Sequence, residues 1–180
     1  MSGYIWQNFF RKSDLQFEVE EALRQTYIFS SLSKHELRFV QETVHVRTFK
    51  AGESVFRQGE VGVGMYVLLK GSLEVSVDHI VEGGGAVHNH MVARLQAGDF
   101  LGELSLVEHN SRRTATAIAN EESQLIGFFK PDLFEILERQ PATGVKILLR
   151  LSEVLGRRLK ETTTKVTELK EQLRRTGQPV

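Results

Sequence analysis

The chain has 180 residues, and its 23 Lys and Arg balance 23 Asp and Glu, so its formal net charge at pH 7 is zero. This balance leaves no electrostatic excess to draw the whole chain to nucleic acid or anionic lipid. Cysteine is absent, which excludes disulfides, thiolate metal sites and cysteine nucleophiles and fits a reducing compartment. The sequence shows no apolar run near the ~20 residues of a membrane helix and no secretory signal. We therefore expect a soluble, cytoplasmic protein.

The first thirty residues are expected to be helical. Apolar residues recur at helical spacing between Asp14 and Gln25, and Asp14 is the expected N-cap. Before it, five large apolar residues occupy seven positions next to Arg11 and Lys12: Tyr4, Ile5, Trp6, Phe9 and Phe10. This aromatic segment either docks on a membrane surface or a partner, or packs on the chain's own helices, which is the interpretation we favour.

The middle of the chain has the pattern of short strands separated by turns. Ser33 followed by Glu36 predicts a capping box that opens a helix. Ten of the fifteen glycines then lie between Gly52 and Gly102, among short segments of alternating apolar residues. About eight strands at this spacing favour a β-roll, jelly roll or sandwich.

The C-terminal region predicts one long helix over Ala142–Arg175. At 1.5 Å per residue it would be about 50 Å long, more than one such β domain can cover. Its apolar residues fall in two rows spaced by seven: Leu148, Leu155, Thr162 and Leu169, then Leu159, Val166 and Leu173. This spacing favours a seam between two helices. A helix that covers only its own domain would explain the first half but not the second, so we expect a homodimer.

The residues suited to ligand chemistry concentrate between Gly98 and Thr116. Gly102 has no Cβ, so a ligand can approach its backbone. Glu103–Val107 can form one helical turn whose free N–H groups point at an anion. The Arg113 guanidinium can bind two phosphate oxygens, and the Glu103 carboxylate suits a ribose hydroxyl. One arginine and one helix end balance a singly charged phosphodiester, and the loop typical of nucleoside triphosphate sites is absent.

These residues carry a family resemblance. Gly102-Glu-Leu-Ser-Leu106, a short loop and Arg113-Thr-Ala115 resemble the phosphate-binding cassette of cyclic nucleotide-binding domains. The likeness runs from about Ile28 to Lys165, and within the family it is greatest to the receptor domain of bacterial cAMP receptor proteins. It implies a mainly β, α+β fold: an eight-stranded, jelly-roll-like β-roll (a double-stranded β-helix) flanked by N-terminal helices and a long C-terminal helix. The implied division is a helical extension over 1–30, the nucleotide-binding roll over 31–140 and a dimerisation helix over 141–180.

The resemblance also implies a ligand site made of Gly102, Glu103, Leu104, Ser105, Arg113, Thr114, Ala115, Arg158, Thr162 and Thr163. Glu103 and the Gly102 backbone would hold the ribose 2′-hydroxyl, and Arg113 the cyclic phosphate. Thr114 would contact the phosphate or a guanine edge, and Arg158 would brace the pocket. Thr162 and Thr163 would reach the base from the long helix, one from each subunit.

The implied function is a stand-alone regulatory receptor that switches conformation when it binds cAMP, or possibly cGMP, and acts on an unknown protein effector. The chain ends at Gln178-Pro-Val180, so we expect no DNA-binding domain such as follows the dimer helix in the transcription factors. We expect no catalysis, because no nucleophile–base set accompanies the cassette. The alternative is a scaffold without nucleotide, in which Glu103 and Arg113 simply form a salt bridge.

One motif invites a metal interpretation. His88-Asn-His90 has the spacing of two metal ligands on a strand, but Met91–Gln96 supplies no carboxylate after it. We therefore predict an exposed polar hairpin there, with no bound metal and no cofactor other than the nucleotide ligand.

Overall fold

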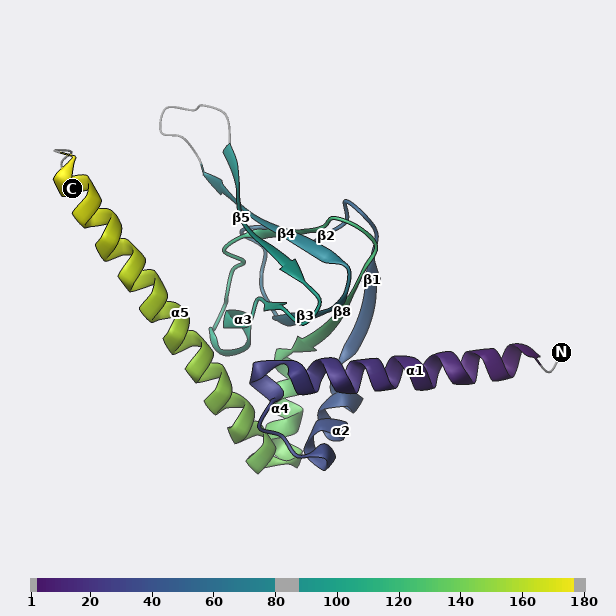
Figure 1. The fold of residues 1–180 in the computed structure, drawn as a ribbon. Coiled ribbons are helices and arrows are strands. Elements are labelled where there is room, and N and C mark those ends of the chain that lie inside the picture. Colours follow the sequence, from purple (N-terminus) through teal and green to yellow (C-terminus); the bar gives the residue numbers. More distant parts are fainter. Residues whose placement is uncertain (1–2, 80–87, 177–180) are drawn as a thin grey trace.

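The structure is a computed structural model that describes residues 3–79 and 88–176, with side chains described for 14–78 and 90–176. Its described part contains eight strands in two antiparallel sheets (Figure 1). One sheet has the order β1 (His45–Phe49), β8 (Ser123–Phe129), β3 (Gly64–Lys70) and β6 (Phe100–Leu101). The other has the order β2 (Ser54–Phe56), β7 (Thr116–Ala119), β4 (Ser72–His79) and β5 (His88–Gln96). The predicted eight-stranded β-roll is confirmed.

Most of the described helical segments gather at one end of the roll. They are α1 (Gly3–Gln25), the 3-10 turn η1 (Tyr27–Phe29), α2 (Lys34–Thr43), α4 (Lys130–Arg139) and α5 (Pro141–Arg175). Figure 1 shows α1 and α5 extending from this end in different directions, with α5 passing along one side of the roll. A short helix, α3 (Leu104–Val107), follows β6 within the cassette.

Two apolar cores explain the strand patterns. Leu68 of β3 and Leu125 of β8 are fully buried in the core that also contains Leu73 and Ala117 of the second sheet. Other side chains of the same two strands, including Met65, belong instead to the core shared with the helices. Because the first sheet is covered on both faces, β3 and β8 are apolar along most of their length instead of alternating.

The predicted start of the first helix is wrong. Asp14 lies inside α1, which begins at Gly3, so it is not the N-cap. No glycine or proline interrupts the chain between these two positions, so nothing in the local sequence ends the helix before Asp14. The side chains of the aromatic segment lie outside the described residues, and both interpretations of that segment stay open.

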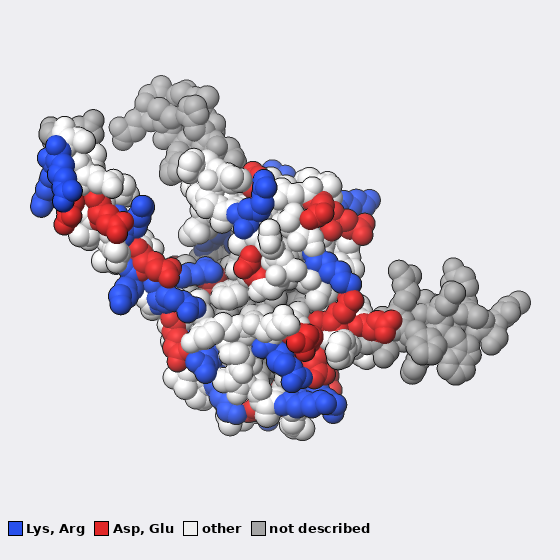
Figure 2. All heavy atoms as spheres, viewed as in Figure 1, with Lys and Arg blue, Asp and Glu red and all other residues white. Residues whose placement is uncertain are grey.

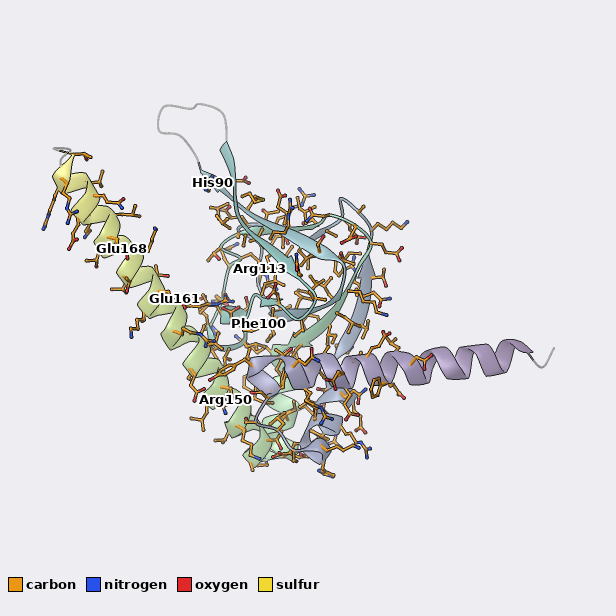
Figure 3. The ribbon with its side chains drawn as sticks, in the orientation of Figure 1. His90, Phe100, Arg113, Arg150, Glu161 and Glu168 are labelled. Carbon is orange, nitrogen blue, oxygen red and sulfur yellow. The ribbon has the colours of Figure 1, made fainter. Side chains whose placement is uncertain are left out.

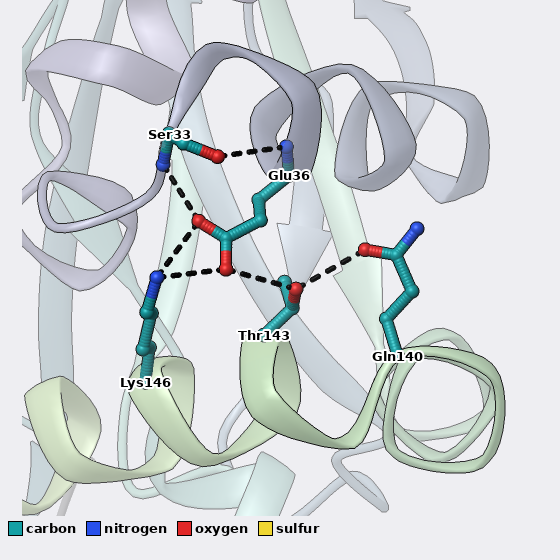
Figure 4. A network of polar contacts seen from close by, with 5 residues as sticks. All are labelled: Ser33, Glu36, Gln140, Thr143 and Lys146. Atoms are coloured by element: carbon teal, nitrogen blue, oxygen red, sulfur yellow. Dashed lines mark hydrogen bonds and ion pairs between the residues drawn. The ribbon is translucent and has the colours of Figure 1, made fainter.

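The predicted capping box at Ser33 is confirmed and forms part of a larger network (Figure 4). The Ser33 amide donates to Glu36 Oε2 over 2.7 Å, and the Glu36 amide donates to Ser33 Oγ over 3.3 Å. Lys146 Nζ lies 2.8 and 2.9 Å from the two carboxylate oxygens, and Thr143 Oγ1 lies 3.2 Å from Oε1. The hydrogen bond from Lys146 and the capping bonds lower the pKa of Glu36 to about 2. This Glu36 network therefore ties the start of α2 to the start of α5.

The long helix has two different halves. Its buried residues all lie between Thr143 and Val154, where α5 packs on the helical core. From Arg157 to Thr176 every residue is exposed.

In the part of the chain that the structure describes, no helix is long and apolar enough to cross a bilayer. The division at residues 30 and 140 stays a prediction.

Candidate functional site

The cassette folds around two glycines. Gly102, between β6 and α3, has a φ of 80°, a conformation that side chains disfavour. A Cβ added there would lie 2.2 Å from Arg113 Nη1, and one added at Gly62 would lie 2.1 Å from Ser105 Oγ. Both glycines are therefore required for the close approach of backbone to Arg113 and Ser105.

The Arg113 guanidinium forms hydrogen bonds through only one of its three nitrogens. It is 6% exposed, and its Nη1 donates to Ser105 Oγ over 3.2 Å and to the Gly102 carbonyl over 3.4 Å. Its Cζ lies 4.1 Å from the centre of the Phe56 ring. Its Nε is buried without a partner, and Nη2 forms no hydrogen bond with the described residues. Desolvation lowers the pKa of Arg113, yet a guanidinium stays charged. The Nε–Nη2 edge is thus free for an acceptor that offers two oxygens.

The Glu103 carboxylate likewise has one oxygen with a partner and one without. It is 4% exposed, and its Oε1 accepts from Arg158 Nη1 of α5 over 2.5 Å. Its Oε2 is buried without a hydrogen-bond partner. Within the described part of the chain Glu103 and Arg113 form no ion pair, so the salt bridge of the ligand-free alternative is not the arrangement found. An ionised carboxylate only accepts, so the open oxygen suits a hydroxyl donor.

A pocket of about 140 Å³ lies against Arg113 and beside the Glu103–Arg158 pair, with Arg158 in its wall and Glu103 behind it. Its walls include seven of the predicted site residues: Gly102, Leu104, Ser105, Arg113, Thr114, Ala115 and Arg158. Figure 3 places Arg113 within the roll and Glu161 and Glu168 on the half of α5 that extends past it. On the face drawn in Figure 2, acidic and basic side chains are interspersed over the roll and α5.

The two helix threonines are not brought into the pocket. Thr162 and Thr163 are exposed on α5, about one turn beyond Arg158. Their hydroxyls donate to the carbonyls of Arg158 and Leu159 over 2.8 and 2.9 Å. Neither hydroxyl bonds to a residue of the roll among the described residues.

The sequence alone missed several wall residues: Phe56, Val75, Leu101, Ser111 and Arg112. Nothing in the local sequence shows that β2, which carries Phe56, lies beside Arg113. Arg112 is exposed, and its Nη1 donates to the Gly59 carbonyl over 2.7 Å. Its guanidinium is therefore engaged outside the contacts that hold Arg113.

The structure describes only part of the predicted hairpin with His88-Asn-His90. His90 is exposed on β5 (Figure 3), whereas the side chains of His88 and Asn89 lie outside the described residues. Among the side chains that are described, no group of three His, Cys, Asp or Glu could hold a metal. The absence of a metal stays a prediction.

The family model for the cyclic nucleotide-binding domain matches residues 46–140, more than half of the chain. The chain belongs to this family. The match includes β2, the cassette and Arg113, so the predicted resemblance is confirmed. The family consists of ligand-binding regulatory domains, so the chain is not expected to be an enzyme by itself, in agreement with the sequence analysis.

Known relatives support the same assignment. The chain is 28% identical over 134 residues to the cyclic AMP receptor protein of Thermus thermophilus, covering 74% of this chain and 57% of that one. It is 32% identical over 133 residues to a cAMP-dependent protein kinase regulatory subunit of Schizosaccharomyces pombe, covering 74% and 29%. The crystal structure of the Thermus thermophilus catabolite activator protein superposes with a TM-score of 0.70 at 26% identity, over 81% of this chain and 63% of that one. The chain thus spans little more than half of the first curated relative, and less than a third of the second.

Proposed function

We propose that this protein is a receptor that binds cAMP in preference to cGMP and changes the position of α5 when it does so. The observation that carries this proposal is the pair of open polar edges in the cassette. Arg113 Nε and Glu103 Oε2 are both buried and both unpartnered. A buried polar atom without a partner costs about 1–3 kcal/mol. A ligand that offers an anion to one and a hydroxyl to the other would remove both costs.

A ribose 3′,5′-cyclic phosphate has these two groups next to each other. Its phosphate carries one negative charge and two exocyclic oxygens, which match the Nε–Nη2 edge of Arg113 in bidentate geometry. Its 2′-hydroxyl is a donor for Glu103 Oε2. The Ser105 and Leu106 amides already donate to the Gly102 and Glu103 carbonyls. The guanidinium is therefore the main donor that we assign to the phosphate.

The preference for adenine rests on the long helix. Thr162 and Thr163 donate their hydroxyl hydrogens to carbonyls of their own helix, so each oxygen is left to accept. Adenine presents an amino donor where guanine presents a carbonyl acceptor. Thr114, exposed at the pocket wall, would be the competing contact for guanine. The relatives named above carry cAMP in their names, which supports the same preference.

The proposed switch depends on Glu103, whose carboxylate would be shared between α5 and the ligand. Glu103 accepts from Arg158 of α5 with one oxygen and would accept from the ribose with the other. A ligand that reorients Glu103 therefore changes the anchoring of α5 on the roll, and with it the surface presented to a protein effector. The two anchors of the helix, this pair and the Glu36 network, lie on different turns of α5.

The exposed half of α5 is our proposed dimer seam. Four of its apolar side chains are 38–69% exposed: Leu159, Val166, Leu169 and Leu173. In a homodimer this seam would bring a second copy of Thr162 and Thr163 towards the base. Sedimentation of the full chain should give twice the 20.4 kDa chain mass, and deletion of residues 166–180 should shift it towards the monomer. A monomer at tens of micromolar full chain would contradict the seam.

Calorimetric titration of the wild type with cAMP and with cGMP tests the proposed receptor. We expect saturable heat with both and an affinity about tenfold higher for cAMP, since one hydrogen bond contributes about 0.5–1.5 kcal/mol. No heat with either nucleotide at high micromolar concentration would instead favour a scaffold that uses the fold without a ligand. A higher affinity for cGMP would leave the receptor intact and overturn the base assignment.

A further inference from the structure

Arg113 lacks the partner that a buried cation usually has. No carboxylate oxygen lies within ion-pair distance of its guanidinium among the described residues, and its two hydrogen bonds both leave from Nη1. Two aromatic rings lie beside it instead, with Cζ 4.1 Å from the centre of the nearer ring, Phe56, and 5.9 Å from that of Tyr66. A cation at this distance over an aromatic face is attracted by the ring's electron density. Such an attraction favours an orientation in which the guanidinium plane stacks on the ring.

The Phe56 ring is itself fixed. The ring of Tyr66 stacks on it with centroids 6.2 Å apart and planes 28° apart. Phe129 meets Tyr66 edge to face at 5.8 Å. Next to Phe56 in the chain, Val55 is buried in the core between the sheets, which anchors β2. The ring therefore gives Arg113 a rigid surface, built from strands that are distant in the sequence.

We infer that Phe56 is a positioning residue for the ligand, acting through Arg113. It presses on one face of the guanidinium while Ser105 and Gly102 hold Nη1, so that the Nε–Nη2 edge keeps one orientation before a phosphate arrives. This inference rests on the proposed function. An aliphatic side chain of similar size would fill the space but leave the plane free to turn and to hydrate, and the lost preorganisation would weaken binding.

Phe56→Leu tests the inference, with Phe56→Tyr as the conservative variant and Phe39→Leu as the matched control. Phe39 is also half-buried beneath an arginine, with Arg139 Cζ 4.9 Å from its ring, but it lies on α2. We expect Phe56→Leu to weaken cAMP binding by roughly 3- to 30-fold. Phe56→Tyr and Phe39→Leu should bind like the wild type. In an Arg113→Ala background, Phe56→Leu should have no further effect, because the residue it positions is gone. Equal affinity of Phe56→Leu and wild type, or an undiminished loss in the Arg113→Ala background, would overturn the inference.

A second measurement needs no ligand. In the nitrogen–proton NMR spectrum of the free protein, the Arg113 Nε–Hε resonance should be shifted upfield by the Phe56 ring current. The shift should be lost in Phe56→Leu and kept in Phe39→Leu. If the wild type binds neither nucleotide, the proposed function fails, and this resonance still decides whether Phe56 orients Arg113. A resonance that Phe56→Leu leaves in place refutes the stacking on which the inference depends.

Discussion

The protein contains two polar clusters that contact the long helix α5, the Glu36 network at its start and the cassette near its middle. In the Glu36 network both carboxylate oxygens are occupied, by Lys146, Ser33 and Thr143. In the cassette the carboxylate of Glu103 and the guanidinium of Arg113 each keep one buried atom unpartnered. A closed cluster stabilises the fold, whereas an open one carries a desolvation cost that only an additional partner can offset.

The number of partners, and not the degree of burial alone, distinguishes the carboxylates of these two clusters. Glu36 is the less buried of the two carboxylates, yet its pKa is strongly lowered because every interaction it makes is already present. Arg113 is more buried and has fewer partners. The two clusters should therefore respond oppositely to substitution, one in stability and the other in nucleotide affinity.

The largest effect is expected at Arg113. Arg113→Ala should weaken cAMP binding by about 1.5–3 kcal/mol or more, the range of a charge-assisted hydrogen bond. Its melting temperature should stay near that of the wild type, because the substitution also removes an uncompensated buried charge. Arg112→Ala is the control and should cost much less affinity, since its exposed guanidinium bonds to the Gly59 carbonyl. Equal losses of affinity in the two variants would show that the anion is held differently.

Glu36→Gln should have the opposite profile. It removes the charge that pairs with Lys146 and weakens the capping box, so we expect a loss of about 1–2 kcal/mol in the free energy of unfolding. The affinity for cAMP should not change. Glu42→Gln, at an exposed position of the same helix, controls for the charge itself. Denaturant titration and calorimetry on the three proteins measure both quantities, and a change in affinity with unchanged stability would reverse our assignment of the two clusters.

Acid titration sharpens the assignment of Glu36. Its pKa is lowered from 4.5 to about 2 in the folded protein, so its contribution to stability is complete above pH 4.5 and is lost as the pH falls towards 2. Glu36→Gln should lack this contribution at every pH. The difference in unfolding free energy between wild type and variant should therefore shrink below pH 4.5, and a difference that stays constant down to pH 2 would contradict the network.

The smallest effect concerns the base. Replacing both Thr162 and Thr163 by Ala should reduce the tenfold preference for cAMP to near equality, a change of about 0.5–1.5 kcal/mol. Thr167→Ala is the matched control, because its hydroxyl makes the same bond to its own helix, 2.9 Å to the Thr163 carbonyl. Competition binding with both nucleotides measures the preference. A double variant that still prefers cAMP would show that these threonines do not select the base.

The sequence by itself determined the elements and the chemical types of the site. Helix period, capping residues and glycine turns are local properties, so the capping box at Ser33 and the long C-terminal helix could be predicted from residues a few positions apart. The order Gly102, Glu103 and Arg113 indicated an anion and a hydroxyl in the same way. The predicted start of α1 was wrong because aspartate is a favourable N-cap residue by local criteria. In the structure the helix already runs through Asp14 from Gly3.

The tertiary structure decided which of these polar groups have all their hydrogen-bond partners and which keep an atom without one. The partner of Glu103 is Arg158, 55 residues away, and the surface beneath Arg113 is Phe56, from another strand. The partner of Glu36 is Lys146, 110 residues away. Such pairs depend on how strands and helices pack, so they cannot be predicted from a local sequence pattern. Whether a buried charge is satisfied is a property of its three-dimensional neighbours, so the distinction between a structural carboxylate and one that awaits a ligand exists only in the folded chain.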